Sequence, residues 1–299
     1  MDNAENIFGR VFERLQKDIL NEKNGDYVNE NDGLVYCGVC HSPKQQISNI
    51  GGGLRKIPKN CICREKELEK ERQHWKELEH QSILSDLRKQ AFEDKLLQNQ
   101  TFEAEDGSLE HRKIGENYVK KFEEMEKENI GLLLTGPVGT GKTYLASAIA
   151  NALIEKEISV KMTNFATILN DMMNLDINKN KYIEKLNKHR LLIIDDFGME
   201  RDTPFATEHI FNIIDSRYRA NKPIILTTNL SAKQLTNPNN LKEQRIYSRI
   251  LEMAIPVLFI GENRRLTKMK EKAQKTVWPS LEKDVGADIL KEVAAEASK

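Results

Sequence analysis

The stretch Gly131-Leu-Leu-Leu-Thr-Gly-Pro-Val-Gly-Thr-Gly-Lys-Thr143 decides the fold. Its apolar first half is typical of a buried strand, and its second half fits the phosphate-binding pattern G-x-x-x-x-G-K-[ST] without a mismatch. Glycines allow such a loop to turn its backbone N–H groups toward phosphate oxygens, and the helix predicted next directs its N-terminal dipole at the same anion. Lys142 is expected to reach the β- and γ-phosphates, and the Thr143 hydroxyl to bind Mg²⁺.

The loop therefore predicts a site for ATP. The residues expected to bind it are Gly136, Pro137, Val138, Gly139, Thr140, Gly141, Lys142, Thr143 and Tyr144. A chance glycine-rich turn is the alternative, but it leaves the strand–loop–helix context unexplained. The dinucleotide pattern G-x-G-x-x-G is not matched, because the glycines read G-x-x-G-x-G.

Two aspartates follow a second apolar run, Leu191-Leu-Ile-Ile-Asp-Asp196. Carboxylates at the carboxyl end of a buried strand lie where ligands bind in open α/β sheets. Asp195 is expected to hold Mg²⁺ together with Thr143, and Asp196 to orient the attacking water. The alternative is that the strand-end aspartate only caps a turn.

Asn229 ends a further predicted strand, at 223–228, where its amide could bond to the attacking water or the γ-phosphate. Turn chemistry is the alternative for an asparagine in this position. One more strand is predicted at 158–162, and the helices between the strands are predicted at 142–156, 165–173 and 206–219. Apolar strands that alternate with helices predict an α/β fold with a parallel sheet covered on both faces.

Four cysteines lie upstream in one short segment, as Cys37-x-x-Cys40 and Cys61-x-Cys63. Four thiolates can close a tetrahedral structural Zn²⁺ site, and the few apolar residues between the pairs could hardly fold without one. Alternatives are reduced, buried cysteines, an iron–sulfur cluster on the same ligands, or His41 in place of one cysteine.

Composition limits the class of protein. The chain has 299 residues and 46 basic against 46 acidic side chains, so its formal net charge is zero. The length suggests about two domains. The zero balance argues against a tail-type nucleic-acid binder but permits a local basic patch, because charge acts within about 10 Å. No secretory signal or run of ~20 apolar residues is found, so a cytoplasmic protein with no membrane partner is expected.

Three regions are predicted: an N-terminal adaptor domain at 1–105, an ATPase domain at 106–275 and a C-terminal tail at 276–299. The adaptor would contain an amphipathic helix before residue 21, the metal-binding module at 36–64, and a charged helix that follows it. The apolar stripe of this last helix would comprise Trp75, Leu78, Ile83, Leu84, Leu87, Phe92 and Leu96.

A basic run at 178–190 surrounds Tyr182 and could track a single-stranded DNA backbone while the ring stacks on a base. A solvated helix before a strand is the alternative interpretation. Its basic residues are Lys179, Lys181, Lys185, Lys188, His189 and Arg190.

Four segments together resemble the AAA+ ATPase core of the DnaC/DnaI bacterial and phage helicase loaders, and of the related IstB transposition ATPases. The resemblance covers about residues 113–275. The segments are Gly131–Thr143, Leu191–Gly198, Ile224–Leu230 and Arg245–Ile250. The resemblance implies an AAA+ P-loop NTPase core preceded by a small helical and zinc-binding domain, since DnaI-type and many phage loaders carry a comparable N-terminal module.

The resemblance also implies roles for single residues. Gly136–Thr143 becomes the Walker A motif, Asp195 and Asp196 the Walker B motif, and Asn229 the sensor 1 residue. Arg249 becomes an arginine finger that reaches the ATP of a neighbouring subunit, and Arg264 resembles the sensor 2 arginine, with Arg265 equally close by position. The residues themselves show that Arg249 shares a predicted helix face with Arg245, where both could be ordinary solvated charges.

The implied function is ATP-dependent loading of a replicative, DnaB-type hexameric helicase onto single-stranded DNA, with self-association through the ATP site. Lys142, Asp195, Asp196, Asn229, Arg249 and Arg264 would carry the catalysis, with ATP, Mg²⁺ and Zn²⁺ as cofactors. Asp196 stands where many AAA+ proteins have glutamate, which predicts slow hydrolysis. Alternatives are an IstB-like transposition helper, a DnaA-like initiator, and an ATP-binding adaptor that does not hydrolyse ATP.

Overall fold

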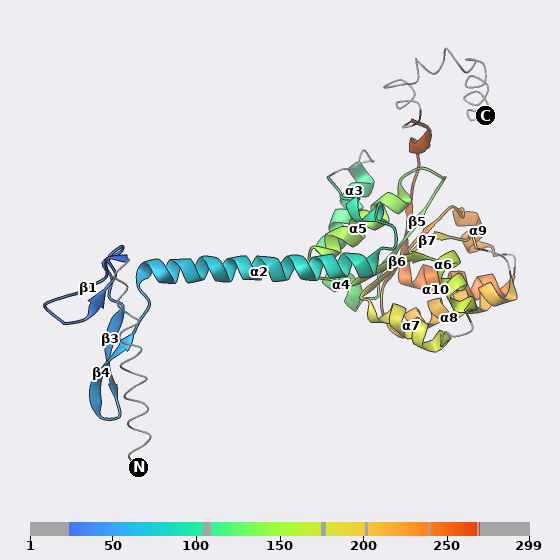
Figure 1. Ribbon diagram of the computed structural model, residues 1–299. Coiled ribbons are helices and arrows are strands. Elements are labelled where there is room, and N and C mark those ends of the chain that lie inside the picture. The colour runs from blue at the N-terminus through green and yellow to red at the C-terminus, as the bar shows by residue number, and fades with distance from the viewer. Residues whose placement is uncertain are drawn as a thin grey trace. The chain divides into compact units, whose positions relative to one another are not determined.

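The computed structural model describes residues 24–103, 109–174, 178–200, 203–238, 240–267 and 269 (Figure 1). The predicted N-terminal helix and the C-terminal tail lie outside these residues. The chain divides into two compact units, Met1–Ser82 and Ile83–Lys299. Residues 83–103, which the sequence analysis grouped with the adaptor, belong to the second unit.

The first unit contains two small antiparallel sheets. Strands β1 (Tyr27–Val28) and β2 (Val35–Tyr36) form one, and the hairpin of β3 (Gln45–Ile50) and β4 (Gly53–Pro58) forms the other. The hairpin turns at Gly51 and Gly52, whose φ angles of 64° and 82° favour glycine. The glycines thus end the first strand of the hairpin in a tight turn.

Helix α2 (Ile62–Ala91) crosses the division between the units. Its mixed charges pair along the exposed surface, as between Arg64 and Glu67. The predicted apolar stripe is wrong for the first part of this helix, where Trp75 is 68% exposed. Only near the end of α2 do apolar side chains, such as Leu84, join a hydrophobic core.

The second unit is built on a parallel sheet. Its strand order is β6-β7-β8-β5-β9 within the described residues, and every neighbouring pair is parallel. The strands are β5 (Gly131–Thr135), β6 (Val160–Asn164), β7 (Leu191–Phe197), β8 (Ile224–Thr228) and β9 (Ala254–Leu258). The connecting helices are α3 (Leu109–Lys120), α4 (Phe122–Lys127), α5 (Lys142–Ile154), α6 (Phe165–Met173), α7 (Lys179–Lys188), α8 (Pro204–Arg219), α9 (Ala232–Thr236) and α10 (Leu241–Met253), with the short 3-10 helix η2 (Leu97–Asn99) before them.

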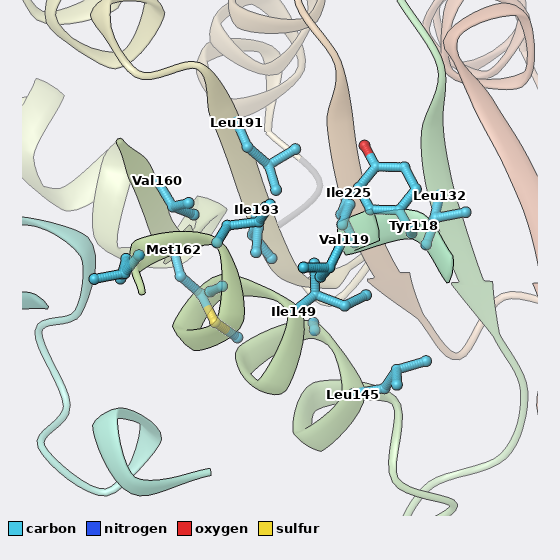
Figure 2. Packing of buried hydrophobic residues seen from close by; sticks show 14 of the residues in the cluster. Tyr118, Val119, Leu132, Leu145, Ile149, Val160, Met162, Leu191, Ile193 and Ile225 are labelled. Atoms are coloured by element: carbon cyan, nitrogen blue, oxygen red, sulfur yellow. The ribbon is translucent and has the colours of Figure 1, made fainter. Parts of the chain in front are cut away.

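Each face of the sheet carries its own hydrophobic core. Because successive residues of a strand point to opposite faces, Leu132 and Leu134 join one core and Leu133 joins the other. Helices α3, α4 and α5 cover the first face, where Leu145 and Ile149 of α5 pack on the sheet (Figure 2). Helices α6, α8 and α10 cover the second. The predicted α/β fold with a covered parallel sheet is confirmed.

Arg217 of α8 is fully buried, and backbone carbonyls satisfy its guanidinium. Its Nη1 donates to His189 O at 2.8 Å, its Nη2 to Arg190 O at 2.8 Å, and its Nη2 also to Pro223 O at 2.9 Å. These carbonyls directly precede β7 and β8. One side chain therefore ties together the amino ends of two adjacent strands.

Candidate functional site

The phosphate loop lies between β5 and α5, at the carboxyl edge of the sheet. Two of its glycines are required by its geometry. Gly139 has a φ of 81°, and a Cβ there would lie 1.9 Å from Asn263 Oδ1. Gly141 has a φ of 101° and begins α5. The loop can therefore take its shape only with residues that lack a side chain at these positions.

Lys142 lies under the loop with only 5% of its surface exposed. Its Nζ donates to Gly136 O at 2.8 Å, to Pro137 O at 2.7 Å and to Asn229 Oδ1 at 2.8 Å. Burial lowers the pKa of this ammonium, and the carboxylates of Asp196 and Asp195 act against that shift. The Lys142 ammonium and the Asn229 amide, both predicted as site residues, thus meet directly.

Asp195 ends the buried part of β7 and accepts two hydroxyl hydrogen bonds on one oxygen. Thr143 Oγ1 donates to Asp195 Oδ1 at 2.9 Å, and Thr227 Oγ1 donates to the same atom at 2.5 Å. Burial raises the pKa of Asp195, and these hydrogen bonds oppose the shift. Thr227 was not predicted as a site residue; its position one strand away from Asp195, in β8, is the signal that could have found it.

Asp196 has a left-handed backbone, with a φ of 53°. The ladder between β7 and β8 is irregular at this point, between Ile194 and Phe197. The Asp196 N–H donates to Thr227 Oγ1 at 2.9 Å, which fixes the bulge. The bulge re-aims the second aspartate, so that its exposed side chain lines the same pocket as the half-buried first one.

A pocket of about 740 Å³ joins these groups and has a volume usual for small-molecule sites. The sequence-predicted residues that line it are Val138, Gly139, Gly141, Lys142, Thr143, Tyr144, Asp195, Asp196, Asn229, Arg264 and Arg265. Both candidate sensor 2 arginines are therefore at the pocket, and Arg264 N donates to Gly139 O at 3.0 Å.

The pocket has a further wall that the sequence analysis missed. It is formed by the segment that follows α2, with Asp94, Leu96, Leu97 and Gln100, and by Asn164 at the end of β6. Asn151 Nδ2 of α5 donates to Leu97 O at 2.8 Å and to Gln100 O at 2.9 Å, which holds this segment against the helix. The position of Asn164 just after an apolar strand was a usable signal. The segment after α2 has none, because its place depends on tertiary packing.

The oxygens of Thr143 and Asp195 fit a Mg²⁺ ion. Two ligands on adjacent corners of an octahedron with Mg–O distances of about 2.1 Å lie about 3 Å apart. The observed separation between Thr143 Oγ1 and Asp195 Oδ1 is 2.9 Å. A hydroxyl and a carboxylate are also the hard oxygen donors that this cation prefers. Both groups predicted to hold Mg²⁺ are therefore suitably placed.

Arg249 is not among the described residues that line the pocket. It lies on α10, the helix predicted to carry it, and packs against α8. Its Nη2 lies 2.7 Å from Asp215 Oδ1 in an ion pair. Within the described residues, the pocket of a single chain is therefore lined without Arg249.

The basic run around Tyr182 corresponds to α7 and the loop that follows it. Tyr182 is partly buried against the core, and its hydroxyl donates to Asp171 Oδ2 at 2.7 Å. Arg190 forms ion pairs with Glu123 and Glu126. The ring is thus held by the fold, whereas Lys181, Lys185 and Lys188 are exposed.

The four cysteines meet in the first unit. Cys37 and Cys40 belong to a tight turn after β2, and Cys61 and Cys63 to the start of α2. All four Sγ atoms lie within 4.8 Å of one another. The Ser42 hydroxyl links the two pairs, since Ile62 N donates to Ser42 Oγ at 2.9 Å and Cys40 Sγ lies 3.0 Å from the same oxygen.

This cluster fits one tetrahedral metal ion. Thiolates at a Zn–S distance of about 2.3 Å lie about 3.8 Å apart at the corners of a tetrahedron. The Sγ of Cys63 lies 3.5 Å from that of Cys37 and 3.1 Å from that of Cys61. An iron–sulfur cluster would hold its ligands farther apart, because several metal and sulfide atoms stand between them. His41 instead directs its Nδ1 to Tyr27 Oη at 3.4 Å.

The sheet order, the phosphate loop after β5 and the acidic end of β7 define an AAA+ P-loop ATPase fold. The family model described as IstB-like ATP binding protein matches residues 63–271. Because this match includes more than half of the chain, the protein belongs to the IstB-like ATP-binding family.

Similar proteins come from two functional settings. The replicative helicase loader DnaI of Bacillus subtilis (strain 168) is 30% identical over 162 residues, which are 50% of this chain and 51% of that protein. The ATP-binding protein of insertion sequence IS232 from Bacillus thuringiensis subsp. berliner is 32% identical over 146 residues, 47% of this chain and 57% of that protein. The chain thus spans little more than half the length of either relative.

A solved structure agrees with the fold. A crystal structure of DnaI superposes with a TM-score of 0.50 at 26% identity, over 60% of this chain and 99% of that one. In the part of the chain that the structure describes, no helix is both long and apolar enough to cross a membrane.

Proposed function

We propose that this protein binds and hydrolyses Mg·ATP and uses its ATP state to load a replicative helicase onto single-stranded DNA. The reaction would be attack of water on the γ-phosphate. The contact that best supports the ATPase part joins Thr143 to Asp195 at 2.9 Å, because it places a Walker A hydroxyl and a Walker B carboxylate on one Mg²⁺-sized edge.

Each polar group of the pocket then has a role. The loop N–H groups and Lys142 bind the phosphates, Thr143 and Asp195 hold Mg²⁺, and Asp196 orients the water with Asn229. Bound Mg²⁺ would neutralise charge on the phosphate oxygens. Arg264 or Arg265 binds the phosphates from the far side of the loop, next to Gly139. Arg249 completes the site of a neighbouring copy of the chain.

The cysteine cluster favours a helicase loader over a transposition ATPase. A zinc-stapled module ahead of an AAA+ core is what the resemblance to DnaI-type loaders implies, and IstB-type proteins generally lack one. The four Sγ atoms within 4.8 Å support such a staple. We therefore assign helicase docking to the first unit, with DNA bound by exposed cations such as Lys181 and Lys185 of α7.

Transposition help is the second candidate function. It is favoured by the family match and by the relative from an insertion sequence, which is as similar to this chain as DnaI is. A DnaA-like initiator would require a helix-turn-helix after the core, in the tail outside the described residues.

The test is reconstitution with the purified protein, the replicative helicase of the same host, and covalently closed circular single-stranded DNA, which has no end for a helicase ring to thread over. We expect ATP-dependent retention of helicase on the circle, no retention with Lys142→Ala, and loss of helicase binding when residues 1–63 are deleted. Recovery of a transposase and no helicase from the host would overturn the loader. Absence of phosphate release at any protein concentration, with or without DNA, would leave only a non-hydrolysing adaptor.

A further inference from the structure

Arg249 is held by a stripe of side chains along α8. Phe211, Asp215 and Tyr218 recur at helical spacing on one face of this helix, and all three contact the guanidinium. The Arg249 Cζ lies 4.6 Å from the Phe211 ring centroid and 6.0 Å from that of Tyr218. The Phe211 ring lies beside the guanidinium, and the Asp215 carboxylate forms an ion pair with it, with Oδ1 at 2.7 Å from Nη2.

The site is partly closed to solvent, which strengthens these contacts. The Asp215 side chain is 14% exposed and that of Arg249 is 26% exposed. A neighbouring pair extends the arrangement, because Tyr218 Oη donates to Glu252 Oε1 at 2.8 Å and so joins α8 to α10 a second time. An arginine side chain loses rotamer entropy when it is fixed, and here contacts within the chain already restrict it.

Asp215 does not simply cancel the charge of Arg249. Its other oxygen, Oδ2, lies 2.9 Å from Nε of Arg219, whose side chain is 75% exposed. One carboxylate thus serves two guanidinium groups. Arg249 is therefore not enclosed in an exclusive ion pair with Asp215.

We infer that Asp215 is a positioning residue that holds the Arg249 guanidinium, on the Phe211 ring, in the orientation needed to reach the γ-phosphate of ATP bound to a second copy of this chain. The inference rests on the proposed function, in which Arg249 acts between copies. If Arg249 acts on ATP bound to a second copy, residues of its own chain must hold its side chain in the required orientation. Asp215 and Phe211 do so.

The primary test measures ATP turnover by phosphate release over a series of protein concentrations. Asp215→Asn keeps the size of the side chain and removes its charge. We expect a kcat about 10- to 100-fold lower, with the KM for ATP changed less than twofold, because misplacing a catalytic group by about 1 Å costs on the order of 100-fold. Arg219→Ala, which removes only the second partner of the same carboxylate, should stay within twofold of wild type.

A mixing experiment separates aiming from structural damage. In a mixture of Asp215→Asn with Lys142→Ala, the Asp215→Asn chain supplies an intact ATP pocket and the Lys142→Ala chain supplies a correctly held Arg249. Turnover should exceed the sum of the two proteins measured apart. Phe211→Leu should show the same lowered kcat and the same recovery on mixing, which keeps the test decisive if Asp215→Asn folds poorly. No recovery with either variant overturns the inference.

Separate outcomes test the action of Arg249 between copies and the positioning role of Asp215. Arg249→Ala should lower kcat by about 10³-fold or more, as expected for an arginine finger, and adding Asp215→Asn to it should change nothing further. Wild-type turnover in Arg249→Ala would overturn the arginine between copies and, with it, the role of Asp215. A strong loss in Arg249→Ala beside wild-type turnover in Asp215→Asn would overturn the role of Asp215 alone.

Discussion

The ATP pocket and the cysteine cluster relate to the fold in opposite ways. Behind the ATP pocket lie two hydrophobic cores, and its polar groups already bond to one another, as Thr143 does to Asp195. Among the described residues before 82, the buried hydrophobic side chains are Val35, Cys37 and Cys61. The hydrophobic cores therefore hold the groups of the ATP pocket in place. The cysteine cluster has few buried side chains around it and depends on its own metal ligation for a fixed structure.

This difference determines which process the free energy of ligand binding drives in each unit. In the second unit, the free energy of ATP binding is available to change the state of a molecule that is already folded. In the cysteine module most of the free energy of metal binding is consumed by folding, because so little apolar surface is buried there. The predictions below test that contrast, beginning with the largest effect.

Metal removal should unfold the module and leave the ATPase core intact. A structural zinc site supplies about 10 kcal/mol or more of folding free energy, which the few buried residues of this module cannot replace. Under chelation, or in Cys61→Ser, amide hydrogen exchange at residues 24–60 should become fast while β5, β7 and β8 remain protected. His41→Ala is the control and should bind zinc normally. Equal loss of protection in both units would contradict the contrast.

Removing Lys142 should weaken ATP binding with little loss of structure. We expect Lys142→Ala to weaken ATP binding by about 10- to 100-fold, since a charged hydrogen bond contributes about 1.5–3 kcal/mol. Binding of a fluorescent ATP analogue and thermal unfolding measure the two effects, and zinc content should stay at the wild-type value. If the chain failed to fold without Lys142, the ATP site would be as dependent on its own chemistry as the cysteine site.

Lengthening the side chain at position 196 should change the rate of ATP turnover without changing the fold of either unit. Asp196→Glu extends the side chain by one methylene toward the attacking water, and we expect turnover to rise by up to about tenfold. Its left-handed backbone tolerates aspartate better than glutamate, so stability should fall by about 1 kcal/mol. Steady-state phosphate release is the measurement, and Asp196→Asn, which should be inactive, is the control. An unchanged or lower rate would argue against Asp196 as the limiting group.

The smallest effect is a pH dependence confined to the ATPase core. Burial, with the positive charges of Lys161 and Arg217, lowers the pKa of His189 to about 4 from its usual 6.5. The unfolded chain therefore takes up this proton first as pH falls, and the resulting stability is complete above pH 6.5 and lost toward pH 4. With allowance for partial exposure the effect is on the order of 1 kcal/mol. Urea unfolding of the core at several pH values should show it, and His189→Gln should flatten that part of the curve.

Secondary structure was predicted best where most residues of an element are apolar. Uniformly apolar runs marked β5, β7 and β8, and the helix of α6 was predicted at its observed bounds. Strand β9 was missed, because Pro256 interrupts its pattern. Proline is tolerated there because β9 is an edge strand that pairs only with β5 among the described strands.

The site shows the same limit. Site residues that are contiguous in the sequence, such as those of the phosphate loop, could be predicted. Groups that reach the pocket through packing could not, including Leu97 and Gln100 after α2. The bond between the Tyr182 hydroxyl and Asp171 could not be predicted either, because it depends on how α6 and α7 pack.

Arg217 has a mechanical consequence. It clamps β7 and β8 at the ends opposite the pocket, and those strands carry Asp195 and lead to Asn229 at their other ends. With one end pinned, the two strands cannot slide past each other, and the spacing between the acid and the amide is set from the far side of the sheet. Motion driven by ATP must then pass through the loops and helices around a stiff central pair of strands.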